Sequence, residues 1–275
     1  MNKSCTNFGF AILLSLCLLL TACKPTTPTL PAPSPTTISP QPAATTETTI
    51  VETQEPPETA LIQEPISPEI LLDPAITQDE DSLLVCSYLY EGLVELDENG
   101  AIEPALAINW TLSGDELDYI FQLRRDVFFH DGSPFTADAV IANFNRWFDP
   151  QSPLRGTSSY DSWEEYFLGF KGEKDAEGKA TSYFDGIEKI NDLSVLIHLN
   201  RPVSDLLSYL TLTQFSIVNP AVLETEGEKY GTQEGSVSGT GSYMLTAWTE
   251  ESLELTPNPQ YWGATTTSIL EFPFR

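Results

Sequence analysis

Basic residues are scarce in this chain. Lysine and arginine together number 13 against 40 aspartates and glutamates, which gives a formal net charge of -27. A chain this acidic repels phosphates, so nucleic acid is not an expected partner. The acidic residues are scattered along the sequence, which is typical of a solvated surface and leaves room only for a weak preference for cationic solutes.

Histidine is almost absent, and this bears on catalysis and metal binding. His130 and His198 are far apart and lack the spacing of a motif such as H-E-x-x-H. No Gly-x-Ser-x-Gly segment is present that would expose a nucleophilic serine. His130-Asp131-Gly132 is more typical of a turn than of a metal site. We therefore expect a binding protein rather than an enzyme, with no metal and no cofactor.

Cysteine is also rare, and its positions do not predict an intrachain disulfide. Cys5 and Cys17 fall in the N-terminal apolar segment, and Cys23 follows that segment. Cys5 and Cys17 would be removed with the signal and Cys23 would carry lipid, so Cys86 is the only free thiol left in the predicted mature chain and no intrachain bridge can form. We expect Cys86 to be a buried structural thiol in a helix over 79–90.

Residues 1–22 resemble a lipoprotein signal peptide. Lys3 supplies the positive start, and the apolar core over 10–20 is too short to span a membrane. The run LTAC, which ends at Cys23, resembles a lipobox, in which the cysteine is acylated and becomes the new N-terminus. The alternative is an ordinary signal peptide with a cysteine near its end, but the spacing favours lipidation at Cys23. Two or three acyl chains would hold the protein stably at a membrane.

Residues 23–58 are dominated by proline and threonine and predict a disordered tether. No aromatic residue occurs between Cys23 and Tyr88. Such a segment cannot bury enough apolar area to offset the entropy lost on ordering, and its prolines keep it extended. We expect it to hold the folded part, residues 59–275, away from the membrane.

The stretch 115–149 predicts two strands followed by a helix. Residues 119–123 alternate in the manner of a strand, and an apolar run over 127–129 predicts a second, short strand. Thr136 is a suitable N-cap, and the residue pair Asp149-Pro150 ends the helix. One helical face carries Val140, Ile141, Phe144, Trp147 and Phe148. Further hairpins are predicted over 93–100, 187–199 and 243–256, a short strand over 60–63, and a helix after Pro202.

The stretch 115–149 resembles the signature region of the family 5 extracytoplasmic solute-binding proteins. These proteins serve ABC importers of oligopeptides, dipeptides, nickel chelates and some oligosaccharides. Segments 71–110, 186–202 and 238–263 are similar to the same family in the same order. The resemblance implies a mixed α/β (α+β) fold: a type II periplasmic-binding-protein-like lobe with an inserted subdomain, within about 115–240.

Members of this family are longer chains in which two lobes enclose the solute. The resemblance therefore implies that residues 59–275 are the N-terminal lobe alone, with the second lobe missing, so that the chain is apparently truncated. It also implies that the loop after Pro74 lies beside a bound peptide, at Thr77, Gln78 and Asp79. Strand addition suits this role, because a peptide of any sequence offers the same backbone groups. The alternative is that these residues cap the helix that follows.

Two further groups of residues match functional positions of the family. Tyr160 and Trp163 match a cleft-facing part of the subdomain and would contact ligand side chains, with core packing as the alternative. A nearby position that is often aromatic in the family is Leu154 here. The segment Gly239-Thr240-Gly241 lacks the lysine and the strand-to-helix context of a phosphate-binding loop. The resemblance implies instead a tight turn near the hinge.

The sequence thus predicts a lipid-anchored solute-binding component of an ABC importer, with peptides as the favoured solute. Its expected partners are the solute, ABC permease subunits and, through lipid at Cys23, the extracytoplasmic face of a bacterial cell membrane. The alternatives are a lipid-anchored module without a role in transport and a non-functional fragment of a split receptor.

Overall fold

The computed structural model describes residues 60–264 and 266–275, which belong to one compact unit. The predicted signal peptide over 1–22, the predicted lipidation site Cys23 and the predicted tether over 23–58 lie outside the described residues. No helix in the described part is long and apolar enough to cross a membrane. The unit holds two hydrophobic clusters, a smaller and a larger one.

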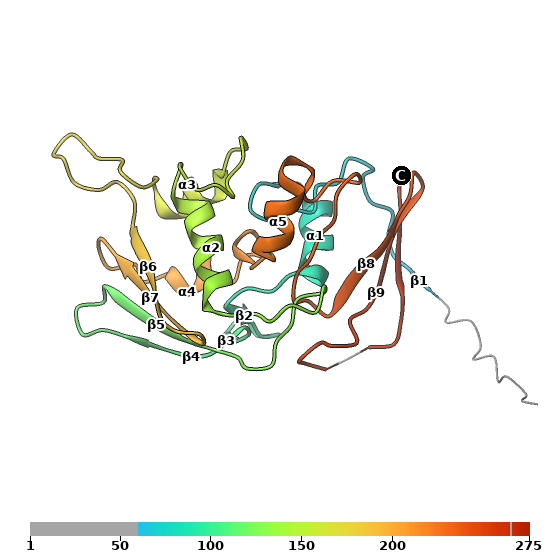
Figure 1. The fold of residues 1–275 in the computed structure, drawn as a ribbon, viewed down its shortest axis with the longest axis horizontal. Helices are drawn as coiled ribbons and strands as arrows, with labels where there is room; N and C mark the ends of the chain where they lie inside the picture. Colours follow the sequence, from blue (N-terminus) through green and yellow to red (C-terminus); the bar gives the residue numbers. More distant parts are fainter. Residues whose placement is uncertain (1–59, 265) are drawn as a thin grey trace, which may run out of the picture. The chain divides into compact units, whose positions relative to one another are not determined.

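The smaller cluster lies between a four-stranded sheet and helix α1 (Figure 1). The sheet has the order β1-β10-β9-β8, in which β1 is parallel to β10 and the other neighbours are antiparallel. Its strands are β1 (Leu61–Ile62), β8 (Tyr243–Trp248), β9 (Ser252–Pro257) and β10 (Leu270–Pro273). Helix α1 (Glu80–Leu89) begins after Asp79, whose side chain accepts a hydrogen bond from Ser82 N and satisfies a free donor of the first turn. The short helices α5 (Pro220–Glu226) and η2 (Gly227–Lys229) precede β8.

The larger cluster lies under a second four-stranded sheet of order β4-β5-β7-β6, in which all neighbours are antiparallel. Its strands are β4 (Ala107–Leu112), β5 (Asp118–Leu123), β6 (Phe184–Asn191) and β7 (Ser194–Leu199). Helix α2 (Ala137–Phe148) packs on β6 and β7, and α3 (Asp161–Phe167) adds Trp163 and Phe167 to the same cluster. The short helices α4 (Leu206–Tyr209) and η1 (Thr213–Phe215) complete it.

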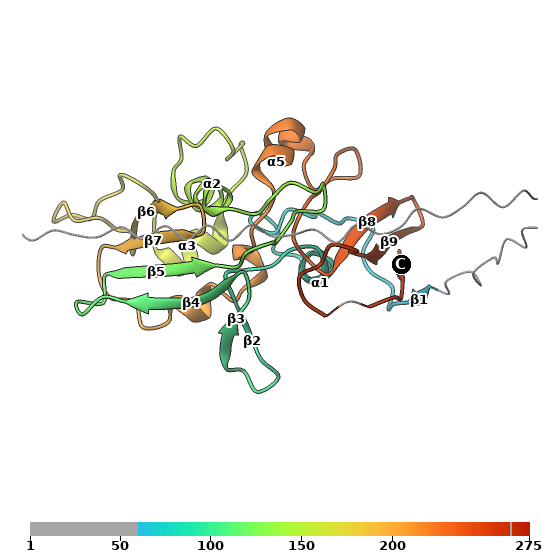
Figure 2. The same ribbon diagram turned by 60° about the horizontal axis from the view of Figure 1, so that its bottom comes forward.

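A separate hairpin of β2 (Val94–Leu96) and β3 (Ile102–Pro104) projects from the chain between the two sheets (Figure 2). Asp97 organises its turn, because one carboxylate oxygen accepts hydrogen bonds from Asn99 N at 2.8 Å and Ala101 N at 2.7 Å. Gly100 has a φ of 80°, a conformation that glycine adopts without strain. The predicted turn over 97–100 is confirmed.

The chain crosses from the smaller cluster to the larger one and back. Except for Ala75, the residues of the larger cluster fall between Leu93 and Ile217, and those of the smaller cluster fall on either side of that range. The insertion predicted from the sequence, about 115–240, starts and ends further along the chain than the range from Leu93 to Ile217. The two crossing segments are joined where Ile217 N donates to Glu91 O at 2.9 Å.

The predicted helix over α2 and its apolar face are confirmed. Val140, Phe144, Trp147 and Phe148 are buried, and Ile141 is half-buried. Thr136 is the N-cap by backbone geometry, although its side chain makes no capping hydrogen bond. The predicted hairpins over 187–199 and 243–256 correspond to β6–β7 and β8–β9.

Two predicted elements were wrong. Residues 127–129 form only an isolated bridge between Phe128 and Pro134, because the chain turns back at once through a hydrogen bond from Phe129 N to Ser133 O. The helix expected after Pro202 is reduced to α4, because the residues after Val203 first form a turn in which Leu206 N donates to Val203 O.

Candidate functional site

A cavity of about 350 Å³ lies between the loop before α1, the end of α2, the loop over 153–158, and α5 with η2. Arg146 comes from α2, Asp73 and Ile76 from the loop before α1, and Leu154 from the loop over 153–158. The cavity is therefore built where segments of both clusters meet. We call this cavity the candidate site.

A buried ion pair between Asp73 and Arg146 lines the candidate site. Arg146 Nη1 donates to Asp73 Oδ1 at 3.0 Å, and Nη2 donates to Oδ2. The Arg146 and Asp73 side chains are only 3% and 2% exposed. Burial alone lowers the pKa of the Arg146 guanidinium, but the Asp73 carboxylate outweighs burial and raises that pKa above its ordinary value. The pair brings no net charge to the cavity.

Arg155 also lines the cavity, but its guanidinium group is bonded to the end of helix α2. Its Nη1 donates to the carbonyl oxygens of Arg146 at 3.1 Å and Trp147 at 2.6 Å, at the C-terminal end of α2. Cations are favourable at this end of a helix. The guanidinium also lies 4.1 Å from the Tyr160 ring centroid and 4.4 Å from that of Phe170. Arg155 therefore fixes the loop over 153–158 to α2.

The remaining charges of the candidate site are carboxylates on its exposed side. Glu224 and Glu228 are exposed, and neither forms an ion pair with another described residue. Glu228 Oε1 accepts a hydrogen bond from Thr157 N at 3.3 Å, which holds the loop against η2. The depth of the candidate site therefore holds no unbonded guanidinium group, and its edge is acidic.

The structure assigns local bonding roles to Thr77, Gln78 and Asp79. Asp79 caps α1, and Thr77, which is 4% exposed, accepts a hydrogen bond from Asp79 N. Gln78 is exposed and its Nε2 donates to Ser162 Oγ of α3 at 2.8 Å. Thr77 N and Ile76 N donate to Asp73 O, so strand addition at these positions would require that turn to open. Solute contact by these residues stays a prediction.

Tyr160 and Trp163 lie in the larger cluster, where they are 2% and 1% exposed. Tyr160 OH donates to Arg155 O at 2.7 Å, and burial raises its pKa to about 12. Trp163 Nε1 donates to Gly169 O, and its ring stacks on Phe167 with centroids 4.1 Å apart. Their observed environment is that of core residues, and direct contact of either ring with a solute stays a prediction.

Gly239 and Gly241 pass against the end of α1. A Cβ atom on Gly239 would lie 2.0 Å from Leu89 O, and one on Gly241 would lie 2.3 Å from Tyr88 O. His130 bonds to the same turn: its Nδ1 accepts from Gly239 N at 3.2 Å, which leaves Nε2 to donate to Gly241 O at 3.3 Å. Burial lowers the pKa of His130 to about 4. The two glycines thus serve close packing of the backbone, and a hinge role for 239–241 stays a prediction.

Thr240, between these glycines, bonds to the carboxylate of Glu91, a residue for which the sequence predicted no role. Glu91 accepts hydrogen bonds from Thr240 Oγ1 at 2.7 Å, Tyr261 OH at 3.0 Å and Trp262 Nε1 at 3.0 Å. The Arg124 guanidinium lies 3.6 Å from the Trp262 ring centroid. Burial raises the pKa of Glu91. These bonds tie the crossing between the clusters to the turn over 239–241 and to the segment after β9.

Cys86 is a free, buried thiol on α1, as predicted, and burial raises its pKa well above its usual value. Within residues 60–264 and 266–275, no group of three or more His, Cys, Asp or Glu side chains could hold a metal ion.

The fold defines the class of protein. A structure of DppA from Helicobacter pylori in complex with the peptide STSA superposes with a TM-score of 0.67 at 24% identity, and the match covers 78% of this chain and 42% of that one. HbpA2 from Haemophilus parasuis gives a TM-score of 0.67 at 26% identity, with 79% of this chain and 43% of that one covered. The predicted fold, a mixed α/β lobe of the type II periplasmic-binding-protein kind, is confirmed.

The sequence comparisons identify the family. Residues 101–275 match the family model described as "Bacterial extracellular solute-binding proteins, family 5 Middle", and the chain belongs to this family. The periplasmic oligopeptide-binding protein OppA of Escherichia coli K12 is 30% identical over 199 residues, which cover 72% of this chain and 36% of OppA. The glutathione-binding protein GsiB of the same strain is 31% identical over 180 residues, which cover 65% of this chain and 30% of GsiB. The chain spans about a third of the length of these relatives, and the family is one of binding proteins, not enzymes.

Proposed function

We propose that the described residues form one wall of a solute-binding site in an extracytoplasmic receptor of an ABC importer, and that peptides are its favoured solutes. The observation that carries this proposal is the candidate site itself, a cavity of about 350 Å³ whose polar groups are already held in place. Preformed pockets with a few fixed polar groups are typical of small-molecule sites. Among the relatives, OppA is named for oligopeptides and the DppA structure contains a peptide, which supports peptide as the solute class.

The fixed parts of the wall are the Asp73–Arg146 pair and the loop that Arg155 holds. Since both guanidinium groups are bonded within the protein, a peptide carboxylate would find no free cation in the depth of this wall. A peptide ammonium group would instead meet Glu224 and Glu228 at the edge. We therefore expect the described residues to contribute shape and backbone contacts in the depth of the site, and negative charge at its edge.

We also propose that Cys23 carries the lipid anchor and that permease subunits of an ABC importer are the protein partners. The support for the anchor is the run LTAC at the end of the apolar segment. Mass spectrometry of the exported protein should find diacylglycerol on Cys23, and Cys23→Ser should release the protein from membranes. A water-soluble product that starts at another residue would rule out the anchor.

The solute proposal is tested by a peptide titration followed by backbone amide NMR. A wall that covers a solute from one side leaves its hydrogen bonds exposed to water, where each contributes only about 0.5–1.5 kcal/mol. A few such bonds barely offset the roughly 4 kcal/mol or more lost in association, so we expect affinities of about 1 mM or weaker for this chain. With a pool of di- to pentapeptides, the shifted amides should be those of the loops over 71–78 and 153–158.

Micromolar binding by a monodisperse monomer would show that one wall suffices and that the affinity argument is wrong. Saturable shifts confined to other surfaces would contradict the location of the site. An absence of saturable shifts at peptide concentrations of about 10 mM would favour the alternative of a lipid-anchored module without a transport role.

A further inference from the structure

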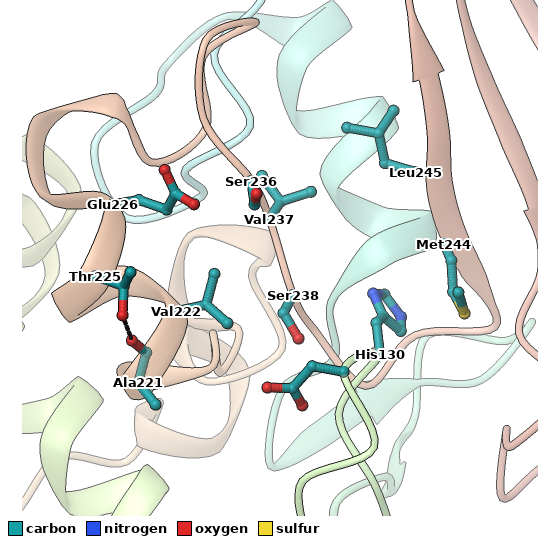
Figure 3. A pocket seen from close by; sticks show the side chains of 11 residues that line it. His130, Ala221, Val222, Thr225, Glu226, Ser236, Val237, Ser238, Met244 and Leu245 are labelled. Carbon is teal, nitrogen blue, oxygen red and sulfur yellow. Dashed lines mark hydrogen bonds between the residues drawn. The ribbon is translucent and has the colours of Figure 1, made fainter.

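A second cavity, of about 500 Å³, lies beside α5 (Figure 3). At 3.6 residues per turn, Ala221, Val222, Thr225 and Glu226 share one face of α5. Leu223, Glu224 and Gly227, which line the candidate site, share the opposite face. The other walls of this second pocket come from the segment 236–238, the start of β8 and the turn at His130.

The middle of the second pocket is apolar. Val222, Val237, Met244 and Leu245 line it, and all are only half-buried, so apolar surface stays open to solvent inside a concavity. In Figure 3, Val222 and Val237 lie between Glu226 on one side and His130 on the other. A volume of about 300–1,000 Å³ with apolar walls is typical of sites for small ligands.

The charged groups of the second pocket are all negative. Glu226 is half-buried and forms no ion pair within the described part of the chain. Asp131 accepts hydrogen bonds from Asn219 Nδ2 at 2.8 Å and from Ser133 N and Oγ at 2.9 and 2.6 Å. These donors are neutral, so they fix the Asp131 carboxylate without cancelling its charge.

No lysine or arginine lines the second pocket, and its histidine is uncharged near neutral pH. Both ring nitrogens of His130 are bonded to the backbone of Gly239 and Gly241, and burial lowers the pKa of the ring to about 4. The apolar surface is therefore flanked by carboxylates that have no positive partner in the pocket.

We propose that the second pocket binds an amphipathic cation, a short aliphatic chain that ends in an ammonium or guanidinium group. The chain would lie against Val222, Val237, Met244 and Leu245, and the cationic head would meet Glu226, with Asp131 adding to the negative potential. Burial of methylene groups supplies attraction, and the carboxylates select the sign of the charge. This chemistry is shared by free alkylamines and by the lysine or arginine side chain of a peptide.

The chain provides its own reporter for this site. It contains two methionines, and Met244, which lines the second pocket, is the one within the described residues. Methionine labelled with ¹³C at its methyl group gives one signal from the second pocket, and Met244 does not line the candidate site. This signal therefore reports on the second pocket even if peptide binding at the candidate site fails.

The experiment titrates the purified full chain with n-hexylamine, which is a cation at neutral pH. We expect a saturable shift of the Met244 methyl signal and no saturable shift with hexanoate. Glu226→Gln should weaken the affinity about tenfold, and since Glu226 is the last residue of α5, losing its negative charge there should not harm the helix. The matched control is Glu98→Gln in the turn of the β2–β3 hairpin, an exposed carboxylate that lines neither pocket, which should change the affinity by less than about twofold.

A second titration with Nα-acetyl-lysine methylamide separates the two sources of the cation. A saturable shift with both probes identifies a site that also accepts a peptide-borne lysine, and a shift with hexylamine alone identifies a site for free amines. The proposal fails if hexylamine gives no saturable shift, if hexanoate gives an equal one, or if both glutamate variants lose affinity equally.

Discussion

Asp73 and Arg146 form a buried ion pair that joins the loop before α1 to helix α2. Asp73 follows Leu72 of the smaller cluster, whereas Arg146 precedes Trp147 of the larger one. Because the pair also lines the candidate site, it couples the relative position of the clusters to the shape of the cavity. Removing one partner should therefore affect both stability and the cavity.

Asp73→Ala should lower the free energy of unfolding by about 3–5 kcal/mol, because it leaves the Arg146 charge buried without a partner. Lys171→Ala is the matched control, since Lys171 is 60% exposed in its pair with Asp149 and such surface pairs contribute about 0–1 kcal/mol. Urea unfolding measures both variants. Equal, small losses would mean that the Asp73–Arg146 pair is not buried in solution.

Trp147→Ala should lower the free energy of unfolding by about 3–5 kcal/mol, because it removes a fully buried ring between Phe144 and Trp163. Leu96→Ala, at a position that is 53% exposed on the β2–β3 hairpin, should be within about 0.5 kcal/mol of the parent chain. Urea unfolding compares the two. An unchanged midpoint for Trp147→Ala would refute the packing of α2.

This packing was predictable from the sequence, because the spacing of Val140, Phe144, Trp147 and Phe148 is a local pattern that only a helix places on one face. The ion pair between Asp73 and Arg146 was not predictable, because the two residues are 73 positions apart and no local pattern relates them. The role of Glu91 was hidden for the same reason, because its donors lie about 150 to 170 residues further along the chain. The environment of Tyr160 and Trp163 was ambiguous, because a local aromatic pattern does not tell whether the side chains face a ligand cleft or pack in a core.

Gly239→Ala should destabilise the fold by at least about 1–3 kcal/mol, because the new Cβ would lie 2.0 Å from Leu89 O, a backbone atom that cannot move alone. Gly114→Ala is the control, since nothing lies within 4 Å of a Cβ there and its φ is not positive. It should be neutral or slightly stabilising by reducing the freedom of the unfolded chain. Thermal unfolding distinguishes the two, and equal midpoints would contradict the close approach of this turn to α1.

Stability should depend on His130 between about pH 4 and pH 6.5. The folded pKa of about 4 is below the ordinary value of 6.5, so the unfolded chain binds more protons in this range and stability rises with pH. The contribution is complete above pH 6.5, is lost as the pH falls towards 4, and is no more than about 3 kcal/mol. Burial raises the pKa of Glu91 and gives an opposite trend, so a single curve does not isolate His130.

The difference between the parent chain and His130→Gln removes this background. Urea unfolding of both proteins at several pH values should give a difference in stability that increases from pH 4 to pH 6.5 and is then constant. A difference independent of pH would mean that the ring is not held neutral by its bonds to Gly239 and Gly241.

The central claim is that the cavity beside Asp73 and Arg146 is a wall of a solute site. The most direct measurement is photo-crosslinking with a short peptide that carries a photoreactive leucine, followed by mass spectrometry, because it captures weak complexes. We predict crosslinks in segments 71–78, 153–158 and 223–228, and fewer of them in Asp73→Ala. Crosslinks spread over the surface, or concentrated on the β2–β3 hairpin with none in these segments, would contradict the claim.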